Sequence, residues 1–562
     1  MYGAQPLTGT QSASTLLAQS IHQRGHMNNG NGLTRRASLA LAASFSALPL
    51  MGLPGTAQAA PVRGGKLVYG RYADSLFLDP VLNDANVDIW VMTNLYDTLL
   101  LPTNDGVGVQ PGLATKWEMK NGGKTLELTL REGVKFADGA PLTAEDVKWS
   151  LDRCRNPKNG PWTDLVGSID SVSVASPSMI VLVLKHPDPS ILAALATFNT
   201  AILPQKLFEA APGTTDEEKA KAYAEKPVGT GPFMLSSWQR GVSMKLVRNP
   251  YYWKKGADGQ PLPYLDEVEF QIIPDDSTRI LKLKAGELHG TEFVPYSRVK
   301  ELKAEKDIRM ELWPSTKVSY ITLNCHPKLK DGTDNPLSNV KVRQALNYAV
   351  NKDAIIAIVT QGLGKPMTSF MSSTTPLYYK QDLYKVDIAK AKALLKEAGF
   401  ANGFETSCLM VAGNQDGLNT LTTLQQMWGA IGVKLKIEQL DNPSLTKRYR
   451  AEDFAMRTAA WTNDISDPSE ITSYFAYYPN IHSLHQQWQD KDVDALFLKS
   501  QQETDPKARA AEYKEIQEKY AASAPILFLY ETPYPVAFRK QAKGFVQIPL
   551  GNNIFESAYI EK

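Results

Sequence analysis

The residues with the clearest chemical potential lie in the stretch WTNDISDP, residues 461–468, which combines an aromatic ring, an amide and two carboxylates. Such a pair of acids could act in catalysis, bind a metal ion or hold a positively charged group. Asp467 stands before a proline, a position typical of turns, so we expect it to be structural. Asp464 is therefore the candidate for chemistry, and the rest of the chain must indicate which kind.

The sequence gives little support for catalysis. It contains no G-x-S-x-G elbow, no H-E-x-x-H element and no Cys/His pair at a motif spacing, and no histidine adjoins the two acids. We expect no enzyme activity and no cofactor, with a hydrolase as a remote alternative. An assay with mixed peptides would reveal any cleavage.

A metal site is a second alternative. His482 and His485 could meet on one helical face and coordinate a chelated metal. Two histidines near Pro479 in a polar run are, however, more typical of a solvated helix start. We therefore keep a receptor for a metal chelate as an alternative and assign no metal ligand.

The start of the chain has the order of an export signal. Residues 1–36 contain no acid, Arg35-Arg36 leads into the apolar run ASLALAASFSALPLMGLPG, and small residues end it at Ala57-Gln58-Ala59. The paired arginines indicate the twin-arginine route, with Met27 as an alternative start. No cysteine follows the apolar run, so we expect a periplasmic protein without a lipid anchor.

Composition is that of a large protein without a nucleic-acid partner. The chain has 61 basic and 59 acidic residues; the first 59 residues hold three arginines and no acid, so the remainder has 58 against 59. No basic stripe with interleaved aromatics appears. About 500 residues are too many for one core, so we expect two or more lobes in a monomer. The three cysteines, Cys154, Cys325 and Cys408, allow at most one internal disulfide.

Strands and helices alternate along the chain, which favours an α/β architecture. Period-two patterns predict strands, and helical spacing with capping residues predicts helices. Thr143 and Asp146 form a capping-box pattern, Asp387 is a candidate N-cap, and Gly399 is a candidate left-handed stop. The main predicted strands are 124–130, 268–273, 433–440 and 525–530, and the main predicted helices are 144–154, 340–350 and 387–398.

Several motifs, read in order, resemble the extracellular solute-binding proteins of family 5, which deliver peptides, nickel complexes, opines and related solutes to ABC importers. They are FLDP (77–80), NLYDTLL (94–100), GLATKWEM (112–119), LTLREGVKFADGAPLTAEDVKWSL (128–151), VGTGPF (228–233), NPYYW (249–253), PYLDEVEFQIIPDDSTR (263–279) and NVKVRQALNYAVNKDAI (339–355). The end of the chain, KGFVQIPLGNNIFESAYIEK, resembles that of dipeptide receptors.

The resemblance implies a two-lobed periplasmic binding protein fold of class II, with the solute enclosed in an interlobe cleft. Lobe I would comprise residues 60–273, lobe II residues 274–530, and residues 531–562 would return to lobe I. The chain would cross at the strand 268–273 and come back near 530–534. Its partners would be the solute and an ABC permease and ATPase in the inner membrane.

The resemblance also assigns candidate ligand-binding residues. Trp461, Thr462, Asn463 and Asp464 match a Trp-x-x-Asp element whose carboxylate receives the α-ammonium of a peptide, although Trp461 could equally fill the core of lobe II.

Three further candidates lie in the first half of the chain. Tyr96 and Trp253 stand in matching motifs of lobe I, with core packing as their alternative role. His289 stands where the family usually has an acid and could contact solute or lie at the surface or hinge.

One departure concerns the carboxylate end of the solute. Dipeptide receptors hold it with an arginine soon after the segment resembling KEAGF, but residues 405–415, ETSCLMVAGNQ, contain no arginine. The resemblance thus implies a short peptide or peptide-like solute, with opines, sugars and metal chelates as alternatives.

Overall fold

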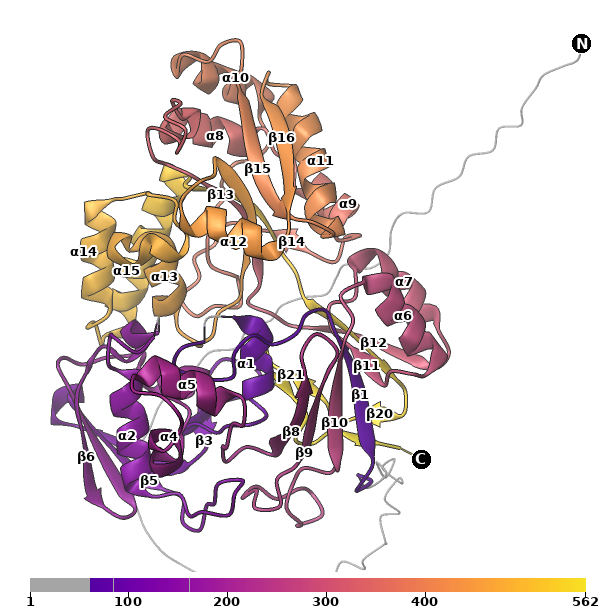
Figure 1. The fold of residues 1–562 in the computed structure, drawn as a ribbon. Coiled ribbons are helices and arrows are strands. Elements are labelled where there is room, and N and C mark those ends of the chain that lie inside the picture. The colour runs from indigo at the N-terminus through magenta and orange to yellow at the C-terminus, as the bar shows by residue number, and fades with distance from the viewer. Residues whose placement is uncertain (1–60, 84, 161, 562) are drawn as a thin grey trace, which may run out of the picture. The chain divides into compact units, whose positions relative to one another are not determined.

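The computed structural model describes residues 61–561 except 84 and 161, so the expected export signal in residues 1–59 lies outside the described residues. The described chain forms two lobes of mixed α/β structure (Figure 1). From the sheets to which the strands belong, we define lobe I as residues 61–313 and 534–561, and lobe II as residues 318–531. Residues 314–317 form the crossing segment between them, and residues 532–533 form the return segment.

Lobe I is organised around a mixed sheet with β1 (Lys66–Arg71) inside it. Strand β1 pairs in parallel with two strands that come much later in the chain, while the outer pairs of the sheet are antiparallel. The sheet order is β12 (Ile308–Trp313), β19 (Tyr534–Arg539), β11 (Gly290–Thr291), β1, β10 (Glu267–Ile272), β9 (Ser243–Arg248) and β8 (Phe233–Gln239).

A second, antiparallel sheet of lobe I confirms the strand predicted after residue 123. In β5 (Thr125–Leu130) the side chains alternate between buried and partly exposed, and Leu126 and Leu128 are fully buried. Its neighbours in the order β4-β5-β7-β6 are β4 (Ala114–Lys120), β7 (Met179–Leu184) and β6 (Ile169–Ser176). The helices of lobe I are α1 (Asn86–Met92), α2 (Ala144–Cys154), α3 (Ile191–Ala194), α4 (Gln205–Glu209), α5 (Asp216–Ala224), α6 (Asp276–Ala285) and α7 (Tyr296–Ala304).

Lobe II surrounds one mixed sheet with helices (Figure 1). The sheet order is β14 (Lys365–Pro366), β18 (Ile526–Glu531), β13 (Val318–Leu323), β17 (Met456–Trp461), β15 (Glu405–Val411) and β16 (Lys434–Leu440). The helices are α8 (Val340–Tyr348), α9 (Lys352–Val359), α10 (Ile388–Glu397), α11 (Gln415–Gly429), α12 (Asn442–Arg450), α13 (Pro468–Ala476), α14 (Lys491–Ser500) and α15 (Pro506–Ser523). The predicted strands 433–440 and 525–530 and helix 340–350 are thus confirmed, within one or two residues.

The predicted helix ends are confirmed where local chemistry determines them. Thr143 and Asp146 form a reciprocal capping box at the start of α2. Asp387 accepts a hydrogen bond from the backbone N–H of Lys390 at the start of α10. Gly399 follows this helix with φ 89°, a conformation that favours glycine.

The chain crosses between the lobes later than expected. The predicted crossing strand, 268–273, corresponds to β10, which lies inside the lobe I sheet between β1 and β9. Strands β11 and β12 then pair within the same sheet, so the chain leaves lobe I only at residues 314–317. The sequence pattern of these two strands is weak, because β11 has only two residues and β12 is only half-buried.

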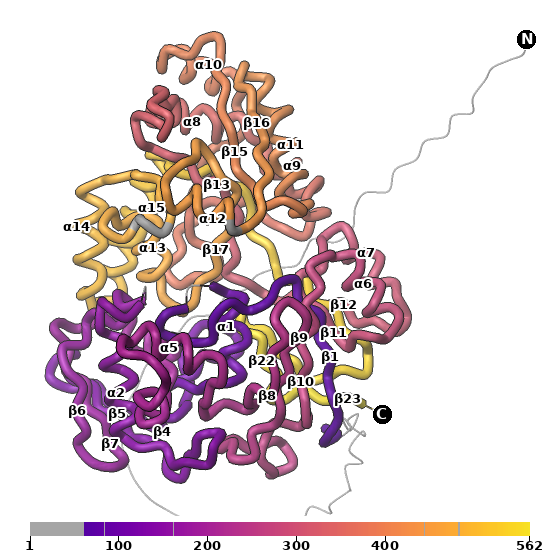
Figure 2. The backbone as a smooth tube through the Cα atoms, in the orientation of Figure 1, coloured from indigo at the N-terminus to yellow at the C-terminus, as the bar shows by residue number. Residues whose placement is uncertain are grey.

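The C-terminal residues complete lobe I. Strand β19 inserts between β11 and β12, and the later residues form the short pairs β20 (Ala542–Lys543) with β23 (Tyr559–Ile560) and β21 (Val546–Gln547) with β22 (Asn553–Ile554). Figure 2 shows this terminal segment in the same lobe as β1. A further short pair joins β2 (Leu100–Pro102) to β3 (Val109–Pro111).

The three cysteines are not joined by a disulfide. Cys154 and Cys408 are buried in different lobes, and Cys325 is half-buried. The fold therefore relies on its buried apolar core.

Candidate functional site

The Trp-x-x-Asp element begins at the end of β17, inside the lobe II sheet. Trp461 is the last residue of this strand and lies opposite Val318 of β13. Its ring packs against Tyr474 and Phe475 of α13, at centroid distances of 5.2 and 5.7 Å. Within the described residues its buried indole N–H has no hydrogen-bond partner. The ring is thus fixed by packing, and one donor remains unused.

The next two residues are tied to the segments that connect the lobes. The Thr462 hydroxyl lies 2.7 Å from the Tyr534 hydroxyl at the start of β19. The backbone N–H of Asn463 donates to the hydroxyl of Thr316 in the crossing segment, at 3.0 Å, and its amide donates to Thr375 at 3.2 Å. Asn463 is fully buried. The element is therefore anchored where the chain passes between the lobes.

Asp464 shares its surroundings with a second acid, Glu470 in the first turn of α13. One oxygen of Glu470 accepts the backbone N–H groups of Asp464 and Ile465, at 2.8 and 3.0 Å. The two carboxyls interact electrostatically, and burial disfavours two negative charges side by side. The pair therefore keeps a proton at neutral pH.

Electrostatics indicate which acid carries that proton. Burial raises the pKa of Asp464 to about 7. Burial, followed by the charge of Asp464, holds the pKa of Glu470 well above its usual range. Glu470 is fully buried, and its second oxygen has no other partner among the described residues. At neutral pH, Glu470 is therefore a neutral acid, and the pair carries at most one negative charge, which lies on Asp464.

Asp467 has the structural role expected of it. It caps α13 through the backbone N–H of Ser469, at 2.9 Å. Both of its oxygens accept from Arg509 of α15 at 2.8 Å, in a buried bidentate ion pair. Asp467 is thus neutralised inside lobe II, whereas Asp464 forms no ion pair in the described part of the chain.

The two lobes contact each other beside this element. Asp164 of lobe I accepts hydrogen bonds from Ser473, at 3.3 Å, and Asn480, at 3.0 Å. Trp162 packs edge-on against Tyr474 with ring centroids 5.5 Å apart. A cavity of about 300 Å³ lies between residues 164–190 of lobe I and 469–502 of lobe II, with Glu470 in its wall. Asp464 therefore lies near the boundary between the two lobes.

Tyr96 and Trp253 occupy a different place, within lobe I. The Tyr96 hydroxyl donates to the carbonyl of Leu78 at 3.0 Å, and the Trp253 indole donates to Asp97 at 2.9 Å. Burial raises the pKa of Asp97 to about 7.

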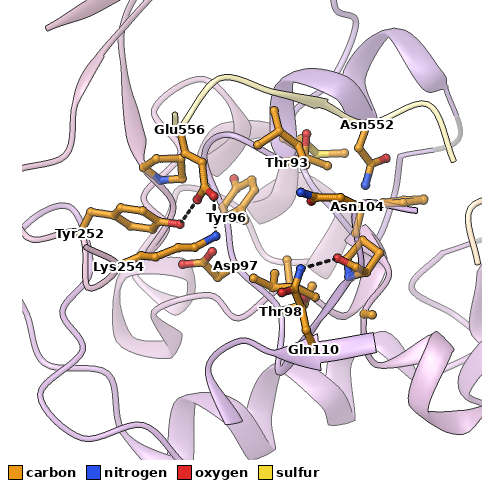
Figure 3. A pocket seen from close by; sticks show the side chains of 18 residues that line it. Thr93, Tyr96, Asp97, Thr98, Asn104, Gln110, Tyr252, Lys254, Asn552 and Glu556 are labelled. Carbon is orange, nitrogen blue, oxygen red and sulfur yellow. Dashed lines mark hydrogen bonds and ion pairs between the residues drawn. The ribbon is translucent and has the colours of Figure 1, made fainter. Parts of the chain in front are cut away.

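Tyr96 and Asp97 line a small cavity of about 90 Å³, in which Tyr252 and Lys254 are directed at Glu556 (Figure 3). All residues lining this cavity belong to lobe I. The structure gives Tyr96 and Trp253 no contact with the Trp-x-x-Asp element.

His289 is part of the lobe I sheet. Its Nδ1 atom accepts the backbone N–H of Val68 at 2.9 Å. Burial, together with the nearby charges of Arg539 and Lys66, lowers its pKa, so the ring is neutral at neutral pH. These contacts place His289 beside β1 and not among the residues around Asp464.

The described residues contain no group of three or more His, Cys, Asp or Glu side chains that could hold a metal ion. The ring of His485 packs edge-on against Tyr449, at 4.6 Å between centroids. The side chain of His482 lies outside the described residues.

Two of the site's features escaped sequence reasoning. Glu470 looked like an ordinary acid in the first turn of a helix, where it would complement the helix dipole. The bonds from Thr316 and Tyr534 to the element join residues 147 and 72 positions apart. No local pattern signals such pairs.

The two-lobed mixed α/β fold matches that of solute-binding receptors, and comparison with known proteins identifies its family. The model for "Bacterial extracellular solute-binding proteins, family 5 Middle" matches residues 108–483. The chain belongs to this family, whose members are solute-binding receptors and not enzymes.

Individual relatives cover most of the chain. It is 31% identical to the dipeptide-binding protein of Escherichia coli K12 over 480 residues, 81% of this chain and 86% of the relative. It is 28% identical to the glutathione-binding protein GsiB of Salmonella typhimurium over 522 residues, 91% and 98% of the two chains. The structure of DppA from Helicobacter pylori in complex with the peptide STSA is similar, with a TM-score of 0.79 and 27% identity over 89% of this chain and 99% of that one.

None of the described helices is both long enough and apolar enough to cross a membrane.

The raised pKa of Asp464 predicts a pH-dependent stability. An unfolded aspartate titrates near pH 4, and the folded one near 7, so the folded protein binds the extra proton between these values. The stability of the empty wild type should therefore fall as pH rises from about 4 to 7. Asp464→Asn removes this loss. Between pH 4 and 7, the free energy of unfolding of the variant should therefore rise relative to that of the wild type by on the order of 2–4 kcal/mol. Denaturant titrations at several pH values measure it.

Asp467→Asn is the matched control, because it breaks a buried ion pair and should destabilise the protein. Parallel stability curves for Asp464→Asn and the wild type across pH 4–8 would show that Asp464 titrates normally.

Proposed function

We propose that this chain is the periplasmic receptor of an ABC importer and captures a short peptide or peptide-like solute for the inner-membrane permease and ATPase. The solutes in the names of its relatives, a dipeptide, glutathione and the peptide STSA, support this class. Each carries a primary ammonium group, so a receptor for them needs an anionic partner inside the cleft.

The proposal rests mainly on the surroundings of the Asp464 carboxyl. Asp464 is largely buried, it is anchored through its own backbone N–H, and it has no basic partner in the described part of the lobes. Burial disfavours a lone carboxylate, whereas an ammonium that enters beside it supplies the missing charge and up to three donors. Binding thus relieves an electrostatic penalty already present in the empty protein.

Glu470 makes this arrangement selective for a single positive charge. Because Glu470 remains neutral, the pair carries at most one negative charge, which lies on Asp464. The Trp461 indole beside Asp464 contributes an apolar wall and an unused N–H. An extended peptide would be held further by main-chain hydrogen bonds, which leave side-chain identity open.

Lobe closure would complete the site. The contacts of Asp164 with Ser473 and Asn480, and of Ser466 with the carbonyl of Val107, join the lobes beside the element. Solute that binds both lobes favours this closed arrangement and excludes water, which strengthens the ion pair at Asp464.

Asp464→Asn tests the ammonium role. The change keeps the shape of the side chain and removes its charge, so the ammonium would be buried without a counterion, a loss on the order of 3–5 kcal/mol. The affinity for a dipeptide probe should fall by about two to three orders of magnitude. Titration calorimetry of wild type and variant measures the change.

The N-acetylated dipeptide serves as the control probe. It should bind the wild type poorly and lose little more with Asp464→Asn, because the interaction is already absent. Equal binding of both probes to the wild type, or full affinity in Asp464→Asn, would contradict the role of Asp464.

We also propose export by the twin-arginine route, on the basis of the sequence of residues 1–59. Changing Arg35 and Arg36 together to lysine should leave the precursor in the cytoplasm. Cell fractionation with detection of precursor and mature forms measures this. Normal maturation of the double variant would indicate the general secretory route instead.

A further inference from the structure

The interlobe cavity of about 300 Å³ is connected to the candidate site through Glu470. Glu470 lies in the cavity wall, and its Oε2 atom accepts the backbone N–H of Asp464 at 2.8 Å. Ser469 and Ser473 of the same helix, α13, line the cavity as well. The helix that follows the Trp-x-x-Asp element therefore forms part of the cavity wall.

The lobe I wall of the cavity contributes two acids. Asp164 accepts its hydrogen bonds from lobe II through Oδ2 alone, and its Oδ1 atom accepts no side-chain hydrogen bond among the described residues. Asp188 accepts hydrogen bonds from the hydroxyls of Ser168 and Ser190, at 2.6 and 2.7 Å. His186 also lines the cavity, and its Nδ1 atom lies 3.0 Å from the backbone carbonyl of the next residue.

The charge of the cavity lining is not balanced by a base. Asp164, Asp188 and Glu470 line it, together with hydroxyl and amide groups, and no Lys or Arg is among the described residues of its wall. Arg509 interacts electrostatically with Asp188, but its guanidinium group is bound to both oxygens of Asp467. Such a cavity suits a cation, because an opposite charge stabilises carboxylates strongly where water is largely excluded.

Glu470 carries an unused hydrogen-bonding atom in the cavity wall. The residue is fully buried, and its Oε1 atom has no hydrogen-bond partner among the described residues. Buried polar atoms in proteins normally have a partner, so this atom is available to a group that enters the cavity. The protein atoms around Asp164 raise the pKa of its carboxyl, and a neighbouring cation would favour its charged form.

A peptide held at Asp464 would direct its first side chain towards this cavity. In a peptide, the N-terminal side chain branches from the carbon atom that carries the ammonium group. The carboxyls of Asp464 and Glu470 interact electrostatically, so an ammonium beside Asp464 places that carbon near the cavity wall. The volume admits a long side chain, since a cavity of about 150 Å³ already accommodates benzene.

We propose that this cavity receives a basic side chain at the N-terminal position of the solute, and that Asp188 and Asp164 select it. The inference rests on the proposed function and narrows its solute class to peptides that begin with lysine, arginine or a similar residue. Because the cavity lies between the lobes, this side chain would contact both of them and favour the closed arrangement.

A structural role for Asp188 is the alternative, because its Oδ1 atom also accepts the backbone N–H of Ser190 at 2.8 Å. Asparagine keeps this acceptor oxygen, so Asp188→Asn removes the charge and retains the turn. Asp170, exposed on β6 and absent from the cavity wall, provides the matched control. Asp170→Asn removes the same charge from the same lobe.

The experiment compares lysyl-alanine with norleucyl-alanine, whose first side chain lacks the ammonium group, by titration calorimetry. The wild type should bind lysyl-alanine about 10- to 100-fold more tightly, the range for hydrogen bonds to a charged group. Asp188→Asn and Asp164→Asn should each reduce this preference, and the double variant should lose it. Asp170→Asn should retain the preference. The affinity for norleucyl-alanine reports whether each variant is folded.

The results that overturn this inference differ from those that overturn the proposed function. If the wild type binds both peptides equally, and Asp464→Asn weakens both, the proposed function stands and the basic subsite is refuted. A preference that persists in the double variant but disappears in Asp464→Asn would assign the side-chain ammonium to Asp464 itself.

Two further outcomes are decisive. If agmatine binds to wild type that is saturated with lysyl-alanine, and Asp188→Asn abolishes this binding, the cavity takes a separate cation and the inference is wrong. If neither dipeptide binds the wild type, the proposed function fails, and the basic subsite fails with it.

Discussion

The central constraint in this protein is a pair of carboxyls, Asp464 and Glu470, that no base neutralises within the described part of the chain. Glu470 keeps its proton at neutral pH, and one of its oxygens accepts two backbone N–H groups of the segment that carries Asp464. The ten-residue stretch from Trp461 to Glu470 therefore forms one structural unit. It contains the start of α13, and Glu470 in the first turn of that helix holds the backbone of Asp464 in place. Asp467 differs from Asp464, because Arg509 neutralises it in an ion pair and its role is structural.

The scaffold holds this unit at the point where the lobes are connected. Bonds from Thr316 in the crossing segment and Tyr534 at the start of β19 fix the residues before Asp464. A change in the angle between the lobes would therefore act near the site, because the connecting segments and the element move together. This coupling suits a receptor in which the bound solute stabilises the closed state.

Much of the fold could be predicted because it depends on local patterns. The alternation of Leu126 and Leu128, the capping box at Thr143 and the left-handed Gly399 each act over a few residues, and each was confirmed. The crossing point was predicted too early, since two-residue β11 joins the lobe I sheet only through strands distant in sequence. The same holds for the candidate site: the sequence indicates Asp464, but the role of Glu470 depends on contacts that only the folded chain creates.

The most direct test of the account is the number of protons released when solute binds. With a pKa of about 7, Asp464 is mostly protonated at pH 6 in the empty protein, and an ammonium can pair only with its ionised form. Calorimetric titration of a dipeptide at pH 6, in buffers of different ionisation enthalpy, should therefore show release of about one proton per solute, and less than about 0.2 at pH 8. Binding without proton release at pH 6 would contradict the claim that Asp464 receives the ammonium.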